Sequence, residues 1–136
     1  MNKQLFSQPI LGIDLKKNRI RIHKLTLQML GYPDYIQLLV NPTAHTIAIR
    51  KSFSGDHLAH RVKHTRITEG NCYELYSTHL LQAMRSVTSN WENKCSYRIY
   101  GKFNSKSCVA VFSMEDIILV DNIPQILEKA GINGQF

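Results

Sequence analysis

A short basic segment near the amino terminus carries the side chains with the clearest potential for binding chemistry. Residues 19–24 read Arg-Ile-Arg-Ile-His-Lys, so basic and aliphatic residues alternate. Such alternation predicts a half-buried strand with the isoleucines inward and Arg19, Arg21 and His23 outward. Guanidinium groups spaced along an exposed strand can lie along phosphates or enter the major groove of DNA. The segment therefore predicts a polyanion-binding strip.

Other basic residues extend this strip. Arg98 and Lys102 belong to the outward face of a second predicted hairpin, with Tyr100 between them. The alternative explanation is the ordinary polar face of an antiparallel sheet, where Lys and Arg are common. The candidate nucleic-acid-binding residues are Lys16, Lys17, Arg19, Arg21, Lys24, Arg50, Lys51, Arg98 and Lys102.

The charge of the chain supports the same interpretation and is unevenly distributed. The net charge is +7, yet residues 1–114 carry 16 Lys and Arg against 6 Asp and Glu. This bias would attract a polyanion and speed its encounter with the protein. The alternative explanation of the positive charge is a solvated basic surface that aids solubility. Residues 115–136 are acidic and are not expected to contact a polyanion. We expect this segment, called the C-terminal clasp, to pack across the core or to form a surface for a protein partner.

A histidine-rich segment is the main alternative site. His57, His60 and His64 have the spacing i, i+3, i+7, which would place their imidazoles on one face of a helix predicted over residues 56–63. Zinc and other first-row metals accept such ligands. The two basic residues between the histidines would repel a divalent cation, and no HExxH motif supplies a general base. The three histidines are therefore only weak candidates for a metal site. The alternative is a polar surface segment that is rich in histidine.

Other catalytic signatures are absent from the sequence. It has no GxSxG, GxGxxG or Walker motif, and no CxxC pair. Cys72, Cys95 and Cys108 are irregularly spaced and are expected to be reduced thiols. Cys72 could pair with His79, although no local signature favours it. We expect a protein that is not an enzyme and holds no cofactor.

The elements that position these residues form a repeated pattern. In the first copy, the strand at 19–24 precedes a helix over 25–30 that Gly31 ends. Strands at 35–40 and 46–50 then form a hairpin around a turn. The second copy predicts a strand at 72–76, a helix at 78–88 capped by Ser77, and strands at 97–103 and 108–113.

The whole chain is expected to form one domain, 1–136, of the α+β class. Two strand–helix–hairpin halves, 16–51 and 71–113, would pack about a pseudo-twofold axis and be joined by a polar connector, 52–70. The clasp at 115–136 would contain a strand-like run at 117–120 and a helix at 123–130. A further short strand is expected at 9–13.

Hydropathy predicts no membrane association. No apolar run approaches the ~18 residues of a spanning helix, and residues 1–8 do not resemble a signal peptide. A cytoplasmic location is expected.

Residues 19–31, Arg-Ile-Arg-Ile-His-Lys-Leu-Thr-Leu-Gln-Met-Leu-Gly, resemble the opening of the AbrB swapped-hairpin domain. In that family an Arg-flanked strand ends in an Ile-Pro-Lys step, and a helical turn then closes with Leu-Gly. The resemblance spans residues 18–50, and tandem copies would resemble the MraZ arrangement. It implies a β-rich dimer or pseudo-dimer that binds duplex DNA selectively, with Arg19, Arg21 and Lys24 matching the binding surface.

This chain departs from the family pattern in several places. His23 replaces the expected proline, and Pro33-Asp34 stands where Gly-Asp usually opens the hairpin. Leu27 stands where an arginine is common. The prediction is nevertheless a protein that binds duplex DNA, in transcriptional or replicative control. The alternatives are an interaction module for an acidic protein and a metal-dependent enzyme that uses the three histidines.

Overall fold

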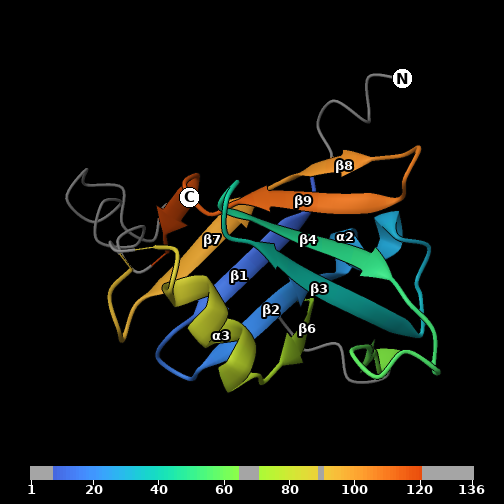
Figure 1. The fold of residues 1–136 in the computed structure, drawn as a ribbon, viewed down its shortest axis with the longest axis horizontal. Coiled ribbons are helices and arrows are strands. Elements are labelled where there is room, and N and C mark those ends of the chain that lie inside the picture. Colours follow the sequence, from blue (N-terminus) through green and yellow to red (C-terminus); the bar gives the residue numbers. More distant parts are fainter. Residues whose placement is uncertain (1–7, 65–70, 89–90, 121–136) are drawn as a thin grey trace, which may run out of the picture.

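Two antiparallel sheets, one in front of the other in Figure 1, form the framework of the protein in the computed structural model. The structure describes residues 8–64, 71–88 and 91–120. The first sheet has the order β10-β7-β1-β2-β6, and the second has the order β5-β3-β4-β9-β8. The first contains β1 (Ile10–Asp14), β2 (Arg19–His23), β6 (Cys72–Leu75), β7 (Ser96–Tyr100) and β10 (Ile117–Leu119). The second contains β3 (Tyr35–Asn41), β4 (Thr46–Lys51), β5 (His60–Arg61), β8 (Lys102–Asn104) and β9 (Val109–Ser113).

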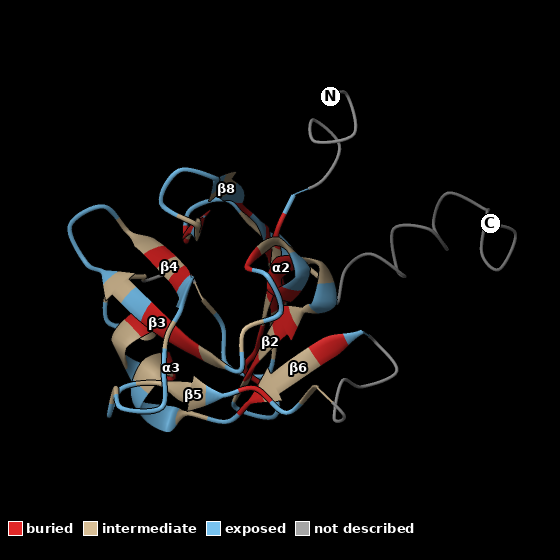
Figure 2. Ribbon diagram, turned by 90° about the vertical axis from the view of Figure 1, so that its right-hand side faces the viewer, coloured by how far each residue is buried: buried red, intermediate tan, exposed pale blue. Residues whose placement is uncertain are grey.

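Alternating side chains explain how the two sheets pack. Ile20 and Ile22 of β2 are fully buried, whereas Arg19 and Arg21 face outward, as the alternation predicted. In the second sheet, aliphatic residues of β3 and β4 and the ring of Phe112 on β9 face the same core. Figure 2 shows the buried segments running along β2, β3 and β4. Burial of the inward apolar residues is what holds the sheets together.

The first hairpin forms where the sequence predicted it. β3 pairs with β4 in a register that places Leu38 opposite Ile49, which puts both in the core. The side chain of Asn41 accepts hydrogen bonds from the backbone N–H groups of Thr43 and Ala44, both at 3.0 Å. This Asx turn reverses the chain between the strands.

Two α-helices lie among the described residues. α2 (Lys24–Met29) begins at His23, whose Nδ1 accepts a hydrogen bond from the N–H of Leu25 at 3.0 Å. It is followed by Gly31 at φ 85°, the left-handed conformation that glycine adopts most readily. α3 (Thr78–Arg85) is capped by Ser77 as predicted and ends earlier than the expected residue 88. Neither helix is long and apolar enough to cross a membrane.

The helix predicted over residues 56–63 is wrong. The carboxylate of Asp56 instead accepts hydrogen bonds from the hydroxyl of Ser52 at 2.7 Å and the N–H of Leu58 at 3.0 Å. These side-chain bonds favour a turn over a helix. Residues 60–61 then form β5, which pairs with β3 and buries the neighbouring Val62. The conformation of this segment is therefore determined by sheet pairing and burial, both of which depend on residues that are distant in the sequence.

The single strand predicted over residues 97–103 is also wrong, because it breaks at Gly101. β7 belongs to the first sheet and β8 to the second. Gly101 is buried, and a Cβ at this position would lie 2.5 Å from the carbonyl oxygen of Val111 and 2.6 Å from Cδ2 of Phe112. Only a glycine allows the chain to cross between the sheets at this distance.

The remaining predicted elements have mixed outcomes. The strands expected near residues 9–13, 72–76, 108–113 and 117–120 form as β1, β6, β9 and β10. The helix expected at 123–130, with most of the predicted clasp, lies outside the described residues. The protein is therefore a strand-rich α+β fold.

Candidate anion-binding site

A hollow on the outer face of the first sheet gathers basic side chains from several strands. At its floor is Gly12 of β1, which is opposite Arg21 of β2 on one side and Arg98 of β7 on the other. Because Gly12 lacks a side chain, the two arginine-bearing strands border an open strip of backbone. The hollow has a volume of about 490 Å³. The basic residues that line it are Lys16, Lys17, Arg19, Arg21 and Arg98.

Arg19 is held by two carboxylates rather than extended as a free donor. Its Nε lies 2.8 Å from Oδ2 of Asp14, and its Nη1 lies 2.5 Å from Oε2 of Glu74. The Arg19 side chain is only 15% exposed. The expectation that Arg19 presents its guanidinium group to a polyanion is therefore wrong, and we assign this residue a positioning role.

Asp14 links the β1–β2 turn to the walls of the hollow. Its carboxylate accepts hydrogen bonds from Arg19, from the hydroxyl of Ser96 at 3.1 Å, and from the backbone N–H groups of Lys16 and Lys17. Burial alone would raise the pKa of Asp14, but these hydrogen bonds outweigh it and hold the pKa below its ordinary value. Asp14 is thus ionised at neutral pH and fixes the turn that carries the two lysines.

Arg98 and Arg21 differ in their surroundings. Arg21 Nε lies 3.5 Å from Oε2 of Glu74, which Arg19 also contacts. Nη1 of Arg98 donates to the hydroxyl of Tyr100 at 3.4 Å, and in the described part of the chain no carboxylate pairs with Arg98. Arg98 is therefore the guanidinium group of this face that a bound anion can neutralise most directly.

His23 and Cys72 complete one wall of the hollow, opposite each other on β2 and β6. Burial and the charges of Arg98 and Arg21 lower the pKa of His23. Its Nδ1 is occupied as the cap of α2, so the ring is neutral at neutral pH. Burial raises the pKa of the Cys72 thiol, which disfavours the thiolate. These groups form a neutral, polar wall and not an activated nucleophile.

Four of the predicted basic residues lie outside the hollow. Lys24 is exposed at the start of α2. Arg50 and Lys51 end β4, where Nε of Arg50 donates to Gln37 at 2.9 Å. Lys102 lies on β8, so Arg98 and Lys102 do not form the single strip that the sequence predicted.

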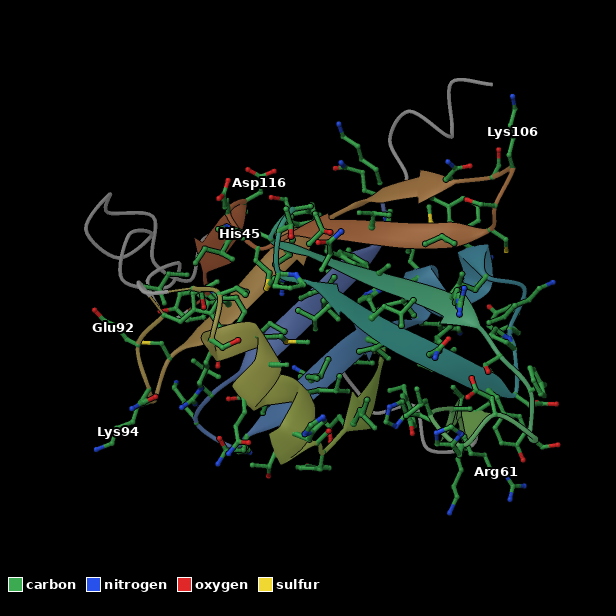
Figure 3. All side chains as sticks on the ribbon, in the orientation of Figure 1. His45, Arg61, Glu92, Lys94, Lys106 and Asp116 are labelled. Atoms are coloured by element: carbon green, nitrogen blue, oxygen red, sulfur yellow. The ribbon has the colours of Figure 1, made fainter. Side chains whose placement is uncertain are left out.

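Three basic residues that the sequence did not single out lie away from the hollow. Arg61, Lys94 and Lys106 project from separate corners of the molecule in Figure 3. Of the nine predicted basic residues, the largest group that the structure brings together is the five that line the hollow.

The predicted histidine cluster does not form. The helix that would align His57, His60 and His64 is replaced by turns and β5. Nε2 of His64 is 2.9 Å from the carbonyl oxygen of Pro33, and its ring packs edge-on against Tyr32. Within residues 8–64, 71–88 and 91–120, no three His, Cys, Asp or Glu residues are placed to hold a metal ion. The metal-enzyme alternative therefore loses its geometric basis.

Sequence reasoning missed several residues of the site. Gly12 was not named as a site residue, yet it lies in regular register within β1 and forms the floor of the hollow. Asp14 and Glu74 were not singled out, because their pairing with Arg19 depends on three strands coming together. A glycine inside a strand often marks a place where a ligand or another backbone approaches closely. Gly12 was therefore the one signal in the sequence from which the floor of the hollow could have been predicted.

Comparison with protein-family models, with curated protein sequences and with solved structures finds no match to this chain.

Proposed function

We propose that the protein binds DNA through the hollow on the outer face of the first sheet, where phosphate groups contact its basic residues. The observation that carries the proposal is the placement of Arg21 and Arg98 on either side of Gly12. A phosphate over Gly12 would be within reach of a guanidinium group from each neighbouring strand, and guanidinium groups suit phosphate geometry. The turn lysines would contact the next phosphate.

The balance of charge around the hollow favours a polyanion. Five cationic side chains line it, whereas Asp14 is the only acidic residue among its lining residues. Asp14 and Glu74 both contact Arg19, and Glu74 also contacts Arg21. Lys17 and Arg98 lie outside that ion-pair cluster and supply positive charge facing solvent. A strand of nucleic acid would gain electrostatic free energy here by releasing its condensed counterions.

The width of the sheet decides how DNA can approach. β2 lies in the interior of the first sheet, between β1 and β6. Five strands span roughly 19 Å, whereas the major groove is only ~12 Å wide. We therefore propose that the basic strand contacts phosphates and does not enter the major groove. Contact through phosphates remains available to this face.

The pattern of strand pairing supports the proposed pseudo-twofold relation between the halves. β2 pairs antiparallel with β6, its counterpart in the second copy, and β4 pairs antiparallel with β9 in the same way. Antiparallel pairing of equivalent strands is what a local twofold axis would produce. The resemblance of residues 18–50 to the AbrB family is compatible with such a pseudo-dimer, and we propose a role in transcriptional or replicative control in the cytoplasm.

A salt titration with matched variants tests the proposal. Binding of labelled DNA by the full chain should weaken with salt, and Arg98→Ala should weaken it further and reduce the log–log slope by about 0.9 for each lost phosphate contact. Lys102→Ala removes the same charge from the other sheet and should have little effect. The absence of DNA binding at low salt, or equal losses in the two variants, would overturn the proposal.

Filling the hollow without changing its charge gives a second test. Gly12→Val would place a branched side chain on the floor between Arg21 and Arg98, where an added Cβ already lies 3.3 Å from the Arg21 Cβ. The variant should bind DNA at least about tenfold more weakly, as expected for the loss of one or two phosphate contacts. Unchanged affinity in a folded variant would show that the phosphates bind elsewhere.

A further inference from the structure

Two exposed tyrosines border the basic hollow. Tyr100, on β7, is 39% exposed, and Tyr76, directly after β6, is 63% exposed. Each is two residues from a charged residue of the same outer face, Arg98 or Glu74 respectively, so the alternation of the strands places it on that face as well. The outer face of the first sheet therefore combines aromatic and cationic groups.

The hydroxyl groups of both tyrosines are tethered to this face. Tyr100 accepts a hydrogen bond from Arg98 at 3.4 Å, and Tyr76 donates to Oε1 of Glu74 at 3.4 Å. A ring held by its hydroxyl loses less rotational freedom on binding, while its flat surface stays accessible. Exposed aromatic rings of this kind serve as stacking platforms for unpaired bases.

The positions of the two rings define a path across the hollow. Tyr100 is opposite Ile10 at the start of β1, whereas Tyr76 follows Leu75, which is opposite Ile20 at the far end of the sheet. Since β1 and β2 separate the strands that carry the tyrosines, the Cα atoms of the two tyrosines are roughly 20 Å apart along a diagonal. Gly12, Arg21 and Arg98 lie between them. An extended strand of about four nucleotides covers this distance, which is at the short end of known single-strand site sizes.

We propose that the site binds single-stranded DNA in preference to duplex DNA, with bases stacked on Tyr100 and Tyr76 and the intervening phosphates over Gly12. This inference rests on the proposed function and specifies its substrate. In a duplex the faces of the bases are covered by the neighbouring base pairs. The tyrosine rings therefore could not stack on them and would add nothing to the affinity for duplex DNA. A single strand offers both phosphates and base faces to the same surface.

The experiment compares one DNA strand of about 12 nucleotides, a length chosen to exceed the site, with the same strand annealed to its complement. Fluorescence anisotropy at fixed salt gives the dissociation constant of the full chain for each probe. The single strand should bind at least about fivefold more tightly. The double variant Tyr76→Leu/Tyr100→Leu should lose about tenfold or more of its single-strand affinity, as expected for two lost stacking contacts. Its duplex affinity should stay within about twofold of the parent, because the phosphate contacts are kept.

Two control variants separate stacking from general effects. Tyr76→Phe/Tyr100→Phe keeps both rings and should retain most of the single-strand affinity. Phe53→Leu removes a 67% exposed aromatic ring that follows β4 of the second sheet, and it should change neither affinity.

The possible outcomes distinguish this inference from the proposed function. Equal affinity for both probes, together with unchanged binding by the folded leucine variant, would overturn the single-strand preference while leaving DNA binding intact. Failure of both probes to bind at low salt would overturn both proposals. Loss of duplex and single-strand binding to the same extent in the leucine variant would also contradict base stacking.

Discussion

Thr26 of α2 makes two hydrogen bonds with the backbone of Ile10 at the start of β1. Its hydroxyl accepts from the N–H of Ile10 at 2.8 Å and donates to the carbonyl oxygen of the same residue at 2.9 Å. Thr26 is fully buried, so water cannot replace these bonds. The pair joins the helix to the central strand that carries Gly12, and thereby fixes one end of the candidate site.

Thr26→Val should destabilise the protein. The substitution keeps the shape of the side chain but leaves both polar groups of Ile10 without their partner. Buried backbone groups left unsatisfied cost about 1–3 kcal/mol each, and we expect a loss of roughly 3 kcal/mol in the free energy of unfolding. Urea unfolding measures it. Thr26→Ser keeps the hydroxyl and should lose less free energy of unfolding. If the Thr26→Val variant were as stable as the wild-type protein, the two hydrogen bonds would not contribute to stability.

Asp14→Asn should weaken the turn that supports the hollow. It removes the negative charge that Arg19 contacts in a largely buried site, and we expect a loss of about 2–4 kcal/mol in the free energy of unfolding. Glu115→Gln is the matched control, because its side-chain contact with His45 is exposed and should contribute little. Equal midpoints of chemical unfolding for both variants would contradict the structural role of Asp14.

Acid titration gives a second readout of Asp14. Because its pKa is lowered in the folded protein, the stabilisation is present above the ordinary value of 3.8 and is lost as pH falls through the lower folded value. Asp14→Asn should therefore unfold with a shallower dependence on pH below about 4. If the stability of the variant depended on pH as steeply as that of the wild-type protein in this range, other carboxylates would be responsible for the acid sensitivity.

His23 should make stability fall in mildly acidic solution. Burial and the nearby arginines lower its folded pKa below the ordinary value of 6.5. Above 6.5 the ring is neutral in both states; as pH falls below this value, the unfolded chain takes up a proton before the folded protein does, and stability is lost until the folded pKa is passed. Thermal unfolding between pH 7.5 and 5 measures this loss.

His23→Asn is the informative variant, because asparagine can cap α2 but does not titrate in this range. It should reduce the pH dependence without a comparable loss at neutral pH. The residual slope should come partly from His60, whose pKa burial also lowers. An unchanged slope in the His23 variant would show that its protonation is not coupled to folding.

Gly101→Ala should be far more costly than Gly12→Ala. The added Cβ at Gly101 would lie 2.5 Å from backbone, so β7 and β8 must shift; overpacking of this kind typically costs about 1–3 kcal/mol. At Gly12 the nearest atom is 3.3 Å away and belongs to the Arg21 side chain. Urea midpoints compare the two variants. A tolerated alanine at Gly101 would mean that the crossing between the sheets does not require glycine.

Local sequence patterns predicted much of the secondary structure. Alternation of Ile20 and Ile22 with basic residues predicted β2 and its buried face, and Ser77 with its apolar stripe predicted α3. The turn of the first hairpin was also predicted, and the side chain of Asn41 stabilises it. These features depend on hydrogen bonds and side-chain spacing within a few residues, so they can be read from a short window of sequence.

Residue contacts that bridge distant segments could not be predicted in this way. Five of the nine predicted basic residues line one hollow, while Lys102 lies on the other sheet because the chain breaks at Gly101. Arg19 was expected to face a ligand but is neutralised by Asp14 and Glu74. The sequence alone determined a basic, strand-rich protein with an outward row of cations. Only the tertiary structure decided which of them face solvent, because that depends on which strands become neighbours and which carboxylates they bring.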